Sequence, residues 1–416
     1  MVRRLKQWES FALTELPMNE PAGNNDGLRA QVRHWLTDNV PAGWRQAMTG
    51  VDQAAFVAAQ KEWFFKLSGA GFATPHWPAE WPGGGRSLAE QKIIYEEIAR
   101  ADAPRLILYF VSLYHAACTI MECGTSAQHE KYLPKILAGE VWCQGFSEPN
   151  AGSDLASLKT RAERKSDRYV INGQKIWSTM GQYADRCLLL ARSGNSGPPQ
   201  AGLTYFLLDM KAKGVSVRPI HQITGDDEFA EIFFDDVEVP IEERVGEEGA
   251  GWAVAQATLA SERGLTLVEL SQRMRYALPM LVSAMESSGV INDGALKAEL
   301  GELITRVDAA CAVADQYLLK RISGREAVGD ASIVKLYYSR TLRAFTSLGL
   351  KIGGLDAQYL TPHMRGATQE TGAWMLDFMN SYNWTIAGGS DEVQRNIIAE
   401  RMLGMQREPR NWLFEG

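Results

Sequence analysis

The sequence predicts an α+β protein in which a helical domain, a β-rich middle domain and a second helical domain follow one another. Apolar residues recur at helical spacing before about residue 140, short β-rich runs separated by Gly, Asp and Pro occupy the middle, and long helical patterns follow Trp252. At 416 residues the chain also exceeds the ~250 to 300 residues at which one hydrophobic core stops growing. We expect domains at 26–140, 141–246 and 247–408.

The first domain is predicted from apolar residues that recur every three or four positions, as in 28–36 and 93–98. Segment 74–85 carries three prolines and three glycines, which exclude regular structure and predict a loop over the surface or a cleft. The apolar run 106–120 contains Ser, Tyr and His and is too short to span a bilayer. It is interpreted as a buried helix.

The middle domain is predicted as a β-barrel or β-sandwich. Its β-rich runs are 169–177, 186–192, 203–209, 215–218 and 230–235, and each is bounded by turn-forming residues. After these runs the strand signals stop. Four long helical patterns follow at about 252–288, 295–323, 330–352 and 367–402, which favour a four-helix bundle.

Charge and cysteine content limit the possible partners. The net charge is −7 with acids and bases mixed along the chain, so we expect neither nucleic-acid binding nor insertion into a membrane. The N-terminus has no secretory pattern, and a cytoplasmic location is expected. The five cysteines form no C-x-x-C pair or metal-ligand spacing, so disulfides and a metal site are not expected.

Three short stretches could carry chemistry. Residues 142–154 (WCQGFSEPNAGSD) form a Gly-Ser loop whose N–H groups and hydroxyls suit a flavin edge or a phosphate, although such a loop is more often a turn. Residues 173–179 (GQKIWST) place a large aromatic between hydroxyls, as core or as the wall of a planar cofactor site. Residues 390–400 begin a helix after two glycines.

Together, and in this order, these stretches resemble the acyl-CoA dehydrogenase family. The matching phrases are Ser-Glu-Pro-x-Ala-Gly-Ser-Asp, Asn-Gly-Gln-Lys-x-Trp and Gln-Arg-Asn-Ile-Ile-Ala-Glu-Arg, and the resemblance runs from about residue 28 to 408. It implies an FAD enzyme of lipid metabolism and β-oxidation, with an acyl-CoA substrate and an electron-transfer flavoprotein as acceptor. It also implies a dimer or tetramer, including a homotetramer.

Carried over residue by residue, the resemblance also implies the cofactor contacts. Two groups would lie around the flavin ring, and a third near the ribityl and adenosine portions. These residues are Gln144, Phe146, Ser147, Gly152 and Ser153 on one side, Trp177, Ser178 and Thr179 on the other, and Ser390 with Glu392 at the third position.

The catalytic base is expected at an unusual position. Many family members carry a glutamate just before the last helix, but this chain has Gly388 there, which cannot accept a proton. The isovaleryl and long-chain branches place the base before an arginine on an earlier helix, and here Glu262 precedes Arg263. We therefore expect Glu262 as base, with Glu269 and Glu286 in reserve. Substrate contacts are expected from Arg263, Ser153, Gly388 and Gly389.

Two departures from the family pattern leave other interpretations open. Segment 285–291 lacks the arginine that reaches the FAD diphosphate of a neighbouring subunit, and Ala387 with Gly388 removes bulk near the reacting carbons. The second departure favours a wide pocket, as in relatives that act on steroid-type chains and assemble from unlike subunits. The alternatives are a flavin oxidase or monooxygenase on the same fold, and a non-catalytic partner subunit of a mixed oligomer.

Overall fold

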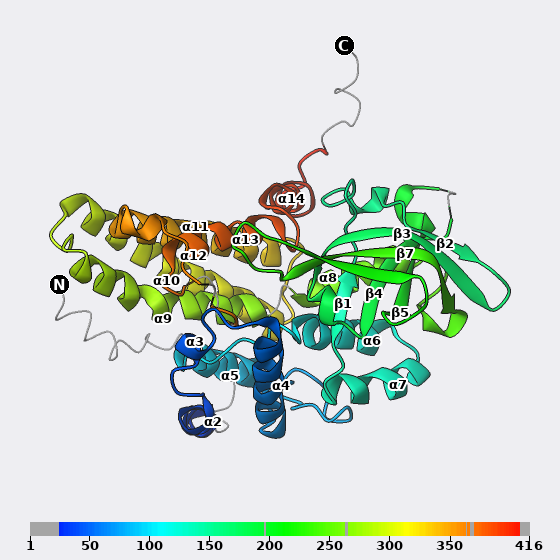
Figure 1. The fold of residues 1–416 in the computed structure, drawn as a ribbon, viewed down its shortest axis with the longest axis horizontal. Coiled ribbons are helices and arrows are strands. Elements are labelled where there is room, and N and C mark those ends of the chain that lie inside the picture. The colour runs from blue at the N-terminus through cyan, green and yellow to red at the C-terminus, as the bar shows by residue number, and fades with distance from the viewer. Residues whose placement is uncertain (1–24, 195–196, 263–264, 363, 367–369, 408–416) are drawn as a thin grey trace, which may run out of the picture.

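A computed structural model describes residues 25–194, 197–262, 265–362, 364–366 and 370–407. It has the predicted α+β architecture, with N-terminal helices packed below an elongated C-terminal helical part and a β-sheet at one end (Figure 1). One hydrophobic core runs through both helical parts and one face of the sheet, and a second lies within the β part. The domain boundaries at 140 and 246 stay a prediction.

The N-terminal part is helical, as its periodicity predicts. It contains α2 (Asn25–Asn39), α3 (Trp44–Ala47), α4 (Gln53–Gly69), α5 (Leu88–Arg100), the π-helical turn η2 (Val111–Ala116), α6 (Ala117–Cys123) and α7 (Ser126–Leu137). Side chains cap three of these helices at their N-termini, since Asp52, Ser87 and Thr125 each accept a backbone N–H of the first turn. The caps explain why α4, α5 and α7 begin where they do.

The irregular loop 74–85 folds back on itself over the core. Trp77 is fully buried, and Gly83 passes so close that an added Cβ would lie 2.3 Å from the Trp77 Cβ and carbonyl oxygen. Only glycine fits this approach. The apolar run 106–120 becomes a turn, η2 and the start of α6, and its polar Ser112 accepts the Trp142 N–H at 2.9 Å. That bond fixes the entry into the β part.

The middle part is an eight-stranded sheet. Its strands are β1 (Trp142–Gly145), β2 (Arg161–Arg164), β3 (Arg168–Thr179), β4 (Arg186–Arg192), β5 (Leu203–Asp209), β6 (Val215–Ile220), β7 (Phe229–Pro240) and β8 (Arg244–Val245). They run in the order β6-β7-β3-β2-β4-β5-β8, and β1 pairs in parallel with β4. Short strands β1, β2 and β8 were not predicted from the sequence.

The C-terminal part is built on long helices. These are α8 (Gly251–Glu262), α9 (Leu265–Ser287), α10 (Gly294–Ile322) and α11 (Asp330–Gly353), followed by shorter α12 (Trp374–Ser381), α13 (Asn383–Ile386), α14 (Asp391–Ile397) and the π-helical η8 (Ile398–Met402). The predicted pattern 367–402 is therefore not one helix. Gly388 and Gly389 have φ of 66° and 89°, a left-handed backbone that ends α13 and turns the chain into α14.

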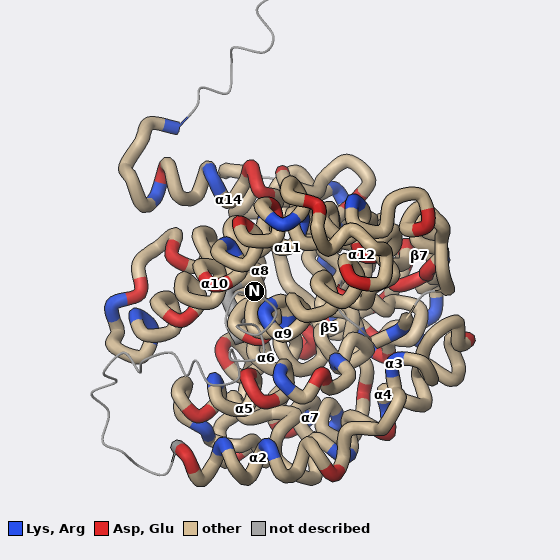
Figure 2. Tube along the Cα trace, turned by 90° about the vertical axis from the view of Figure 1, so that its left-hand side faces the viewer, with Lys and Arg blue, Asp and Glu red and all other residues tan. Residues whose placement is uncertain are grey.

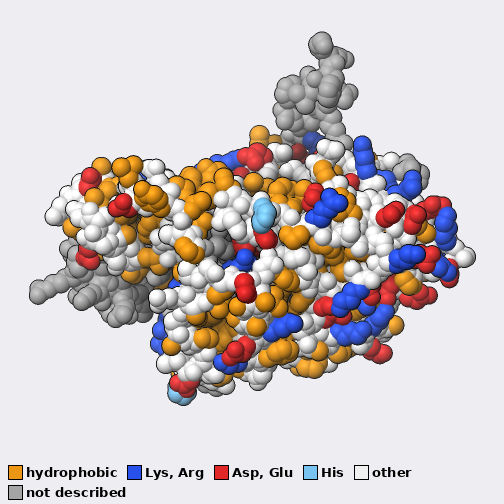
Figure 3. Space-filling model, viewed as in Figure 1, with side chains coloured by type: hydrophobic (Ala, Val, Ile, Leu, Met, Phe, Trp, Pro, Cys, Tyr) orange, Lys and Arg blue, Asp and Glu red, His pale blue; other side chains and the backbone are white. Residues whose placement is uncertain are grey.

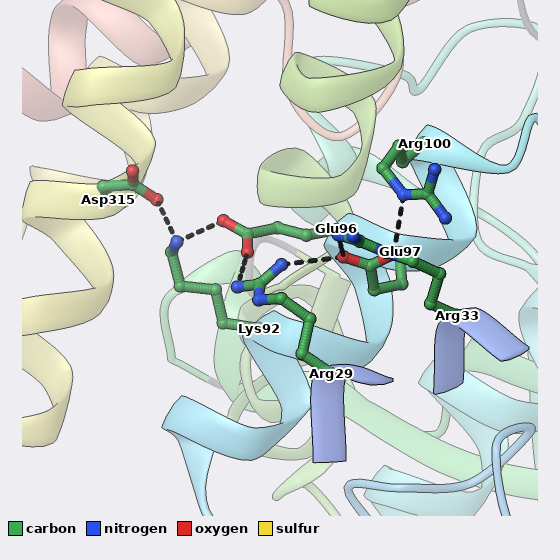
Figure 4. A network of polar contacts seen from close by, with 7 residues as sticks. All are labelled: Arg29, Arg33, Lys92, Glu96, Glu97, Arg100 and Asp315. Carbon is green, nitrogen blue, oxygen red and sulfur yellow. Dashed lines mark hydrogen bonds and ion pairs between the residues drawn. The ribbon is translucent and has the colours of Figure 1, made fainter. Parts of the chain in front are cut away.

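Ion pairs join α2, the first helix that the structure describes, to α5 and α10 (Figure 4). The network contains Arg29 and Arg33 from α2, Lys92, Glu96, Glu97 and Arg100 from α5, and Asp315 from α10. Glu97 is at its centre, 1% exposed, within 2.9 Å of three arginines. Burial opposes ionisation, but these arginines lower the Glu97 pKa to about 2.

The remaining surface carries mixed charges. Seen from its helical end, the molecule shows Lys and Arg interspersed with Asp and Glu rather than a field of one sign (Figure 2). No helix in the described residues is both long and apolar enough to cross a membrane. All five cysteines are free thiols.

Candidate functional site

Two segments far apart in the sequence lie side by side at one end of the sheet. Strand β1 runs into Phe146 and Ser147, and the Ile176 N–H of β3 donates to the Ser147 carbonyl at 2.9 Å. Lys175 Nζ donates to the Phe146 carbonyl, also at 2.9 Å. The structure thus brings the Phe146–Ser147 segment against β3 one residue before Trp177, while their role as the two sides of one ligand stays a prediction.

A buried ion pair holds this arrangement together. Lys175 Nζ lies 2.8 Å from Glu148 Oε1, with the Lys175 side chain fully buried and that of Glu148 9% exposed. Glu148 also accepts the N–H groups of Lys159 and Thr160 at 2.6 and 2.8 Å. Burial lowers the Lys175 pKa to about 8, although the Glu148 carboxylate favours its charged form. The ion pair therefore joins the loop that follows β1 to strand β3.

Sequence reasoning did not single out Lys175 and Glu148 as functional. Both belong to the quoted motifs, but their pairing depends on how β1 and β3 are placed in the sheet, which composition cannot give. A usable signal existed in the alternation of β3, because Lys175 takes an inward position between residues that face outward. A lysine on the buried face of a strand requires a charged partner.

Trp177 has a conformation that plain packing does not explain. Its φ is 63°, it lies in a β-bulge of the pairing with β7, and its side chain is 56% exposed. Left-handed backbone at a large non-glycine residue is uncommon and costs about 1 to 3 kcal/mol. The ring makes a T-shaped contact with Phe229, with centroids 6.1 Å apart. More than half of the Trp177 side chain is nevertheless open to the surface.

Unsatisfied polar groups occur in β1 and β3, the strands that lead to this part of the molecule. Within the described residues, the fully buried Ser178 Oγ and the buried Gln144 Nε2 have no hydrogen-bond partner. Ser153 is exposed, and a Cβ added at Gly152 would meet nothing within 4 Å. Buried donors without partners are expensive in a native protein. An open aromatic face beside unused donors suits a planar ligand with hydrogen-bonding edges.

The C-terminal segment forms a separate turn. Gln394 Nε2 donates to the carbonyls of Gly388 and Gly389 at 2.8 and 3.2 Å, while Ser390 Oγ accepts the Val393 N–H and caps α14. Glu392 is exposed and pairs with Arg395 at 3.2 Å. No hydrogen bond or ion pair joins these residues to the Trp177 group in the part of the chain that the structure describes. The predicted role of these C-terminal residues at the same ligand as Trp177 therefore stays a prediction.

The predicted base lies at a helix boundary. Glu262 is the last residue of α8, but its side chain and the whole of Arg263 lie outside the described residues. The prediction for both therefore stays a prediction. Chain connectivity places Glu262 four residues before Thr266, which lines a small cavity between the two helical parts.

Of the two reserve glutamates, one lies in that cavity and one does not. The cavity has a volume of about 40 Å³, and Glu269 lines it, 8% exposed, with Oε1 2.8 Å from Arg273 Nε. Glu286 is exposed near the end of α9, roughly 25 Å further along the helix at 1.5 Å per residue. In this chain Glu286 therefore faces neither the cavity nor the Trp177 group.

Three family profiles match successive parts of the chain. They are described as the acyl-CoA dehydrogenase N-terminal domain, middle domain and C-terminal domain, and they cover residues 24–140, 143–237 and 249–403. Together they span most of the sequence. The resemblance drawn from the motifs and the fold that it implied are confirmed.

Whole-chain relatives agree with these profiles. The chain is 38% identical over 402 residues to acyl-CoA dehydrogenase IpdE1 of Mycolicibacterium smegmatis, covering 92% of this chain and 98% of the relative. Among solved structures, the Tcur3481-Tcur3483 steroid ACAD has a TM-score of 0.81 at 30% identity, covering 94% of this chain and 99% of that one. The ChsE4-ChsE5 complex from Mycobacterium tuberculosis has a TM-score of 0.76 at 27% identity, covering 94% and 100%.

Proposed function

The chain belongs to the acyl-CoA dehydrogenase family of CH–CH oxidoreductases, and from this we propose FAD-dependent α,β-dehydrogenation of an acyl-CoA, with Glu262 as base. The observation that carries the proposal is the pairing of the open Trp177 face with the Phe146–Ser147 segment across the Lys175–Glu148 ion pair. It supplies a rigid wall for a planar cofactor beside the helical parts.

The residues present fit FAD. Trp177 offers an open ring face, and the buried Ser178 hydroxyl and Gln144 amide offer hydrogen bonds that the protein itself leaves unused. Ser147, Gly152, Ser153 and Thr179 would complete the ring contacts, with Ser390 and Glu392 toward the ribityl and adenosine portions. When bound, FAD would supply the hydride acceptor of the reaction.

The proton chemistry falls to the chain's own residues. Glu262 would remove the α-proton of the thioester, because position 388 has no side chain and the cavity wall begins four residues later at Thr266. Gly388 and Gly389 would donate to the thioester oxygen and stabilise the developing enolate. In support, neither glycine N–H has a backbone acceptor among the described residues, and both glycines have left-handed backbone.

Substrate and partners follow from the same features. Small residues at 387 and 388, together with relatives whose printed names include a steroid ACAD, favour an acyl group wider than a straight chain. Hydrophobic side chains gather over the C-terminal helices on the face seen in Figure 3. Leu355, Tyr359 and Ile386 are each at least 66% exposed, which suits burial in a homo- or hetero-oligomer. An electron-transfer flavoprotein is the proposed acceptor.

Glu262→Gln tests the base. We expect the variant to keep bound FAD, measured by visible absorbance, while acyl-CoA-dependent bleaching of that absorbance slows by about 10² to 10⁴, because a positioned base contributes this much. The matched control is Glu286→Gln, an exposed glutamate on α9 that should bleach at the wild-type rate. Near-normal bleaching by Glu262→Gln would exclude Glu262 and leave Glu269 as the next glutamate to test.

A further inference from the structure

Lys175 joins the two motifs of the candidate site through its ammonium group. Its Nζ donates to the Phe146 carbonyl at 2.9 Å and lies 2.8 Å from Glu148 Oε1. The Lys175 side chain is fully buried, although the desolvation of a lysine is expensive. An apolar side chain of similar volume would fill the same space without that cost. The ammonium group therefore has a role beyond packing.

The bond to Phe146 fixes the direction of the next N–H group. In a planar trans peptide, the C=O of one residue and the N–H of the following residue point in opposite directions. Since the Phe146 carbonyl points at Lys175 Nζ, the Ser147 N–H points away from it. This N–H has no acceptor among the described residues, and Ser147 is only partly buried. It is a donor of fixed direction that remains available to a ligand.

The same segment supports the left-handed backbone of Trp177. The pairing of β3 with β7 has a bulge between Lys175 and Ser178. Within this bulge the Ile176 N–H donates to the Ser147 carbonyl at 2.9 Å instead of to β7. Trp177, with φ of 63°, follows directly. Bulges of this kind redirect side chains next to active sites. The position of Ser147 is therefore coupled to the position of the Trp177 ring.

Glu148 is held at the end of this segment by bonds that do not involve Lys175. Its carboxylate accepts the N–H groups of Lys159 and Thr160. Its backbone N–H and C=O bond to the C=O and N–H of Ala151 at 2.9 and 3.0 Å, which closes a turn. These bonds would remain after replacement of Lys175. The contribution of the lysine can thus be separated from that of the loop.

The proton of Lys175 can be followed by titration. Burial lowers its pKa to about 8, while the Glu148 carboxylate opposes this shift. The other groups that act on it are Cys187 and Arg192 of β4, and Cys143 of β1 is paired with Cys187. Arg192 keeps its charge at all accessible pH values. The hydrogen bond with Cys187 and burial raise the Cys143 pKa well above its usual value, which keeps this thiol protonated.

Resting on the proposed FAD-dependent function, we propose that Lys175 is a positioning residue whose ammonium group orients the Phe146–Ser147 peptide and so presents the Ser147 N–H to the flavin. Lys175 acts through this peptide and takes no part in proton removal. Without the ammonium group the peptide can rotate, and the affinity for FAD falls although the fold is kept.

Two variants isolate the lysine. Glu148→Gln keeps Lys175 and an oxygen for the Thr160 N–H, whereas Lys175→Met/Glu148→Gln also removes the ammonium group and leaves no buried charge unpaired. The Kd of FAD is measured by equilibrium dialysis of the holoenzyme at pH 6 and constant protein concentration. We expect it to be at least about 10-fold higher in the double variant than in Glu148→Gln, because a hydrogen bond from a charged donor is lost. The absorbance maxima of the FAD that stays bound should also shift.

The unmutated protein provides a second measurement that does not depend on the folding of a variant. If FAD binds only to the form with protonated Lys175, the Kd of FAD should rise about 10-fold from pH 7 to pH 9, through the pKa near 8. The double variant lacks this proton and should show no such rise. Cys187→Ala, and Lys165→Met at an exposed ion pair, are the controls and should retain it.

Three results would overturn the inference. They are equal Kd values for Glu148→Gln and the double variant, a constant Kd from pH 7 to pH 9 in the unmutated protein, and a rise that persists in the double variant. Far-UV circular dichroism checks that the variants are folded. If the double variant is not, the profiles of the unmutated protein and of Cys187→Ala decide. A protein that binds FAD but is not bleached by acyl-CoA would instead reject the proposed dehydrogenation, because these measurements do not use bleaching.

Discussion

Helix α5 carries two polar clusters on different faces, and the two are built by opposite rules. Glu97 faces α2 and is held by Arg29, Arg33 and Arg100 at 2.7 to 2.9 Å. Two residues earlier, Tyr95 faces the cavity, where Glu269 has one arginine partner. Residues two positions apart on one helix thus serve a saturated ionic network and a polar cavity in which Glu269 has a single charged partner.

The difference separates stability from binding. Where every buried charge has its partners, the arrangement stabilises the fold and leaves nothing for a ligand to use. Where buried donors or acceptors lack hydrogen-bond partners, their desolvation lowers the stability of the fold. A ligand that forms hydrogen bonds with them gains affinity. Saturation of a buried cluster is therefore a criterion for its role, and it can be tested at each face of α5.

The largest effect is expected at Glu97. Glu97→Gln removes the charge shared by three arginines and should lower the free energy of unfolding by about 3 kcal/mol, measured by urea denaturation. Because the folded-state pKa is lowered to about 2, the stabilisation is complete above the unfolded value near 4.5 and is lost as pH falls toward 2. Affinity for acyl-CoA products should stay unchanged.

Glu302→Gln is the matched control for Glu97. Its partner Arg306 lies at i+4 on α10, and both side chains are about half exposed, so removal should change stability by less than about 0.5 kcal/mol. If Glu97→Gln lowered the free energy of unfolding no more than this control, the network in Figure 4 would not stabilise the fold. The contrast between the two faces of α5 would then be wrong.

Much of the fold could be predicted because its elements have strong local signals. Strands β4 and β5 have the predicted bounds, since their central side chains are buried and mostly apolar. Strand β2 was missed because three of its four residues are exposed and charged, and its pairing with β3 defines it rather than its own side chains. The helix break at Gly388 and Gly389 was not predicted, because the apolar pattern of 367–402 continues on both sides of it.

Sequence motifs identified residues of the candidate site but not their conformation or their contacts. Trp177 was named from its phrase, but its left-handed backbone depends on a bulge in the pairing with β7. Glu269 was named as a reserve base, whereas its place beside Tyr95 and Tyr114 follows from packing of α9 on α5 and η2. Contacts between residues more than 100 positions apart leave no local trace in one sequence. Glu262 remains a prediction.

The pH dependence of stability tests the cavity face of α5 through His76, which packs on Tyr114. His76 stacks on Tyr114 with centroids 5.0 Å apart, and its Nε2 donates to the Leu113 carbonyl at 3.2 Å. Burial lowers the His76 pKa to about 4, below the unfolded value near 6.5. The unfolded chain therefore binds the extra proton between these values, and stability falls by about 2 kcal/mol from pH 7 to pH 5.

His76→Phe keeps a ring on Tyr114 but cannot titrate. It should remove this drop between pH 7 and pH 5, whatever its effect at pH 7, while the exposed His34→Gln retains it. An unchanged drop in His76→Phe would contradict the assignment. The window from 6.5 to 4 lies above the window of Glu97 from 4.5 to 2, so the stability loss due to His76 should precede the loss due to Glu97 as the pH falls.

The smallest effect is expected for the tyrosine pair. In a double-mutant cycle of Tyr95→Phe and Tyr114→Phe, the coupling energy for unfolding should be about 1 kcal/mol, since one neutral hydrogen bond at 3.1 Å joins the hydroxyls. Coupling near that of a charged pair would make this face as saturated as the Glu97 face.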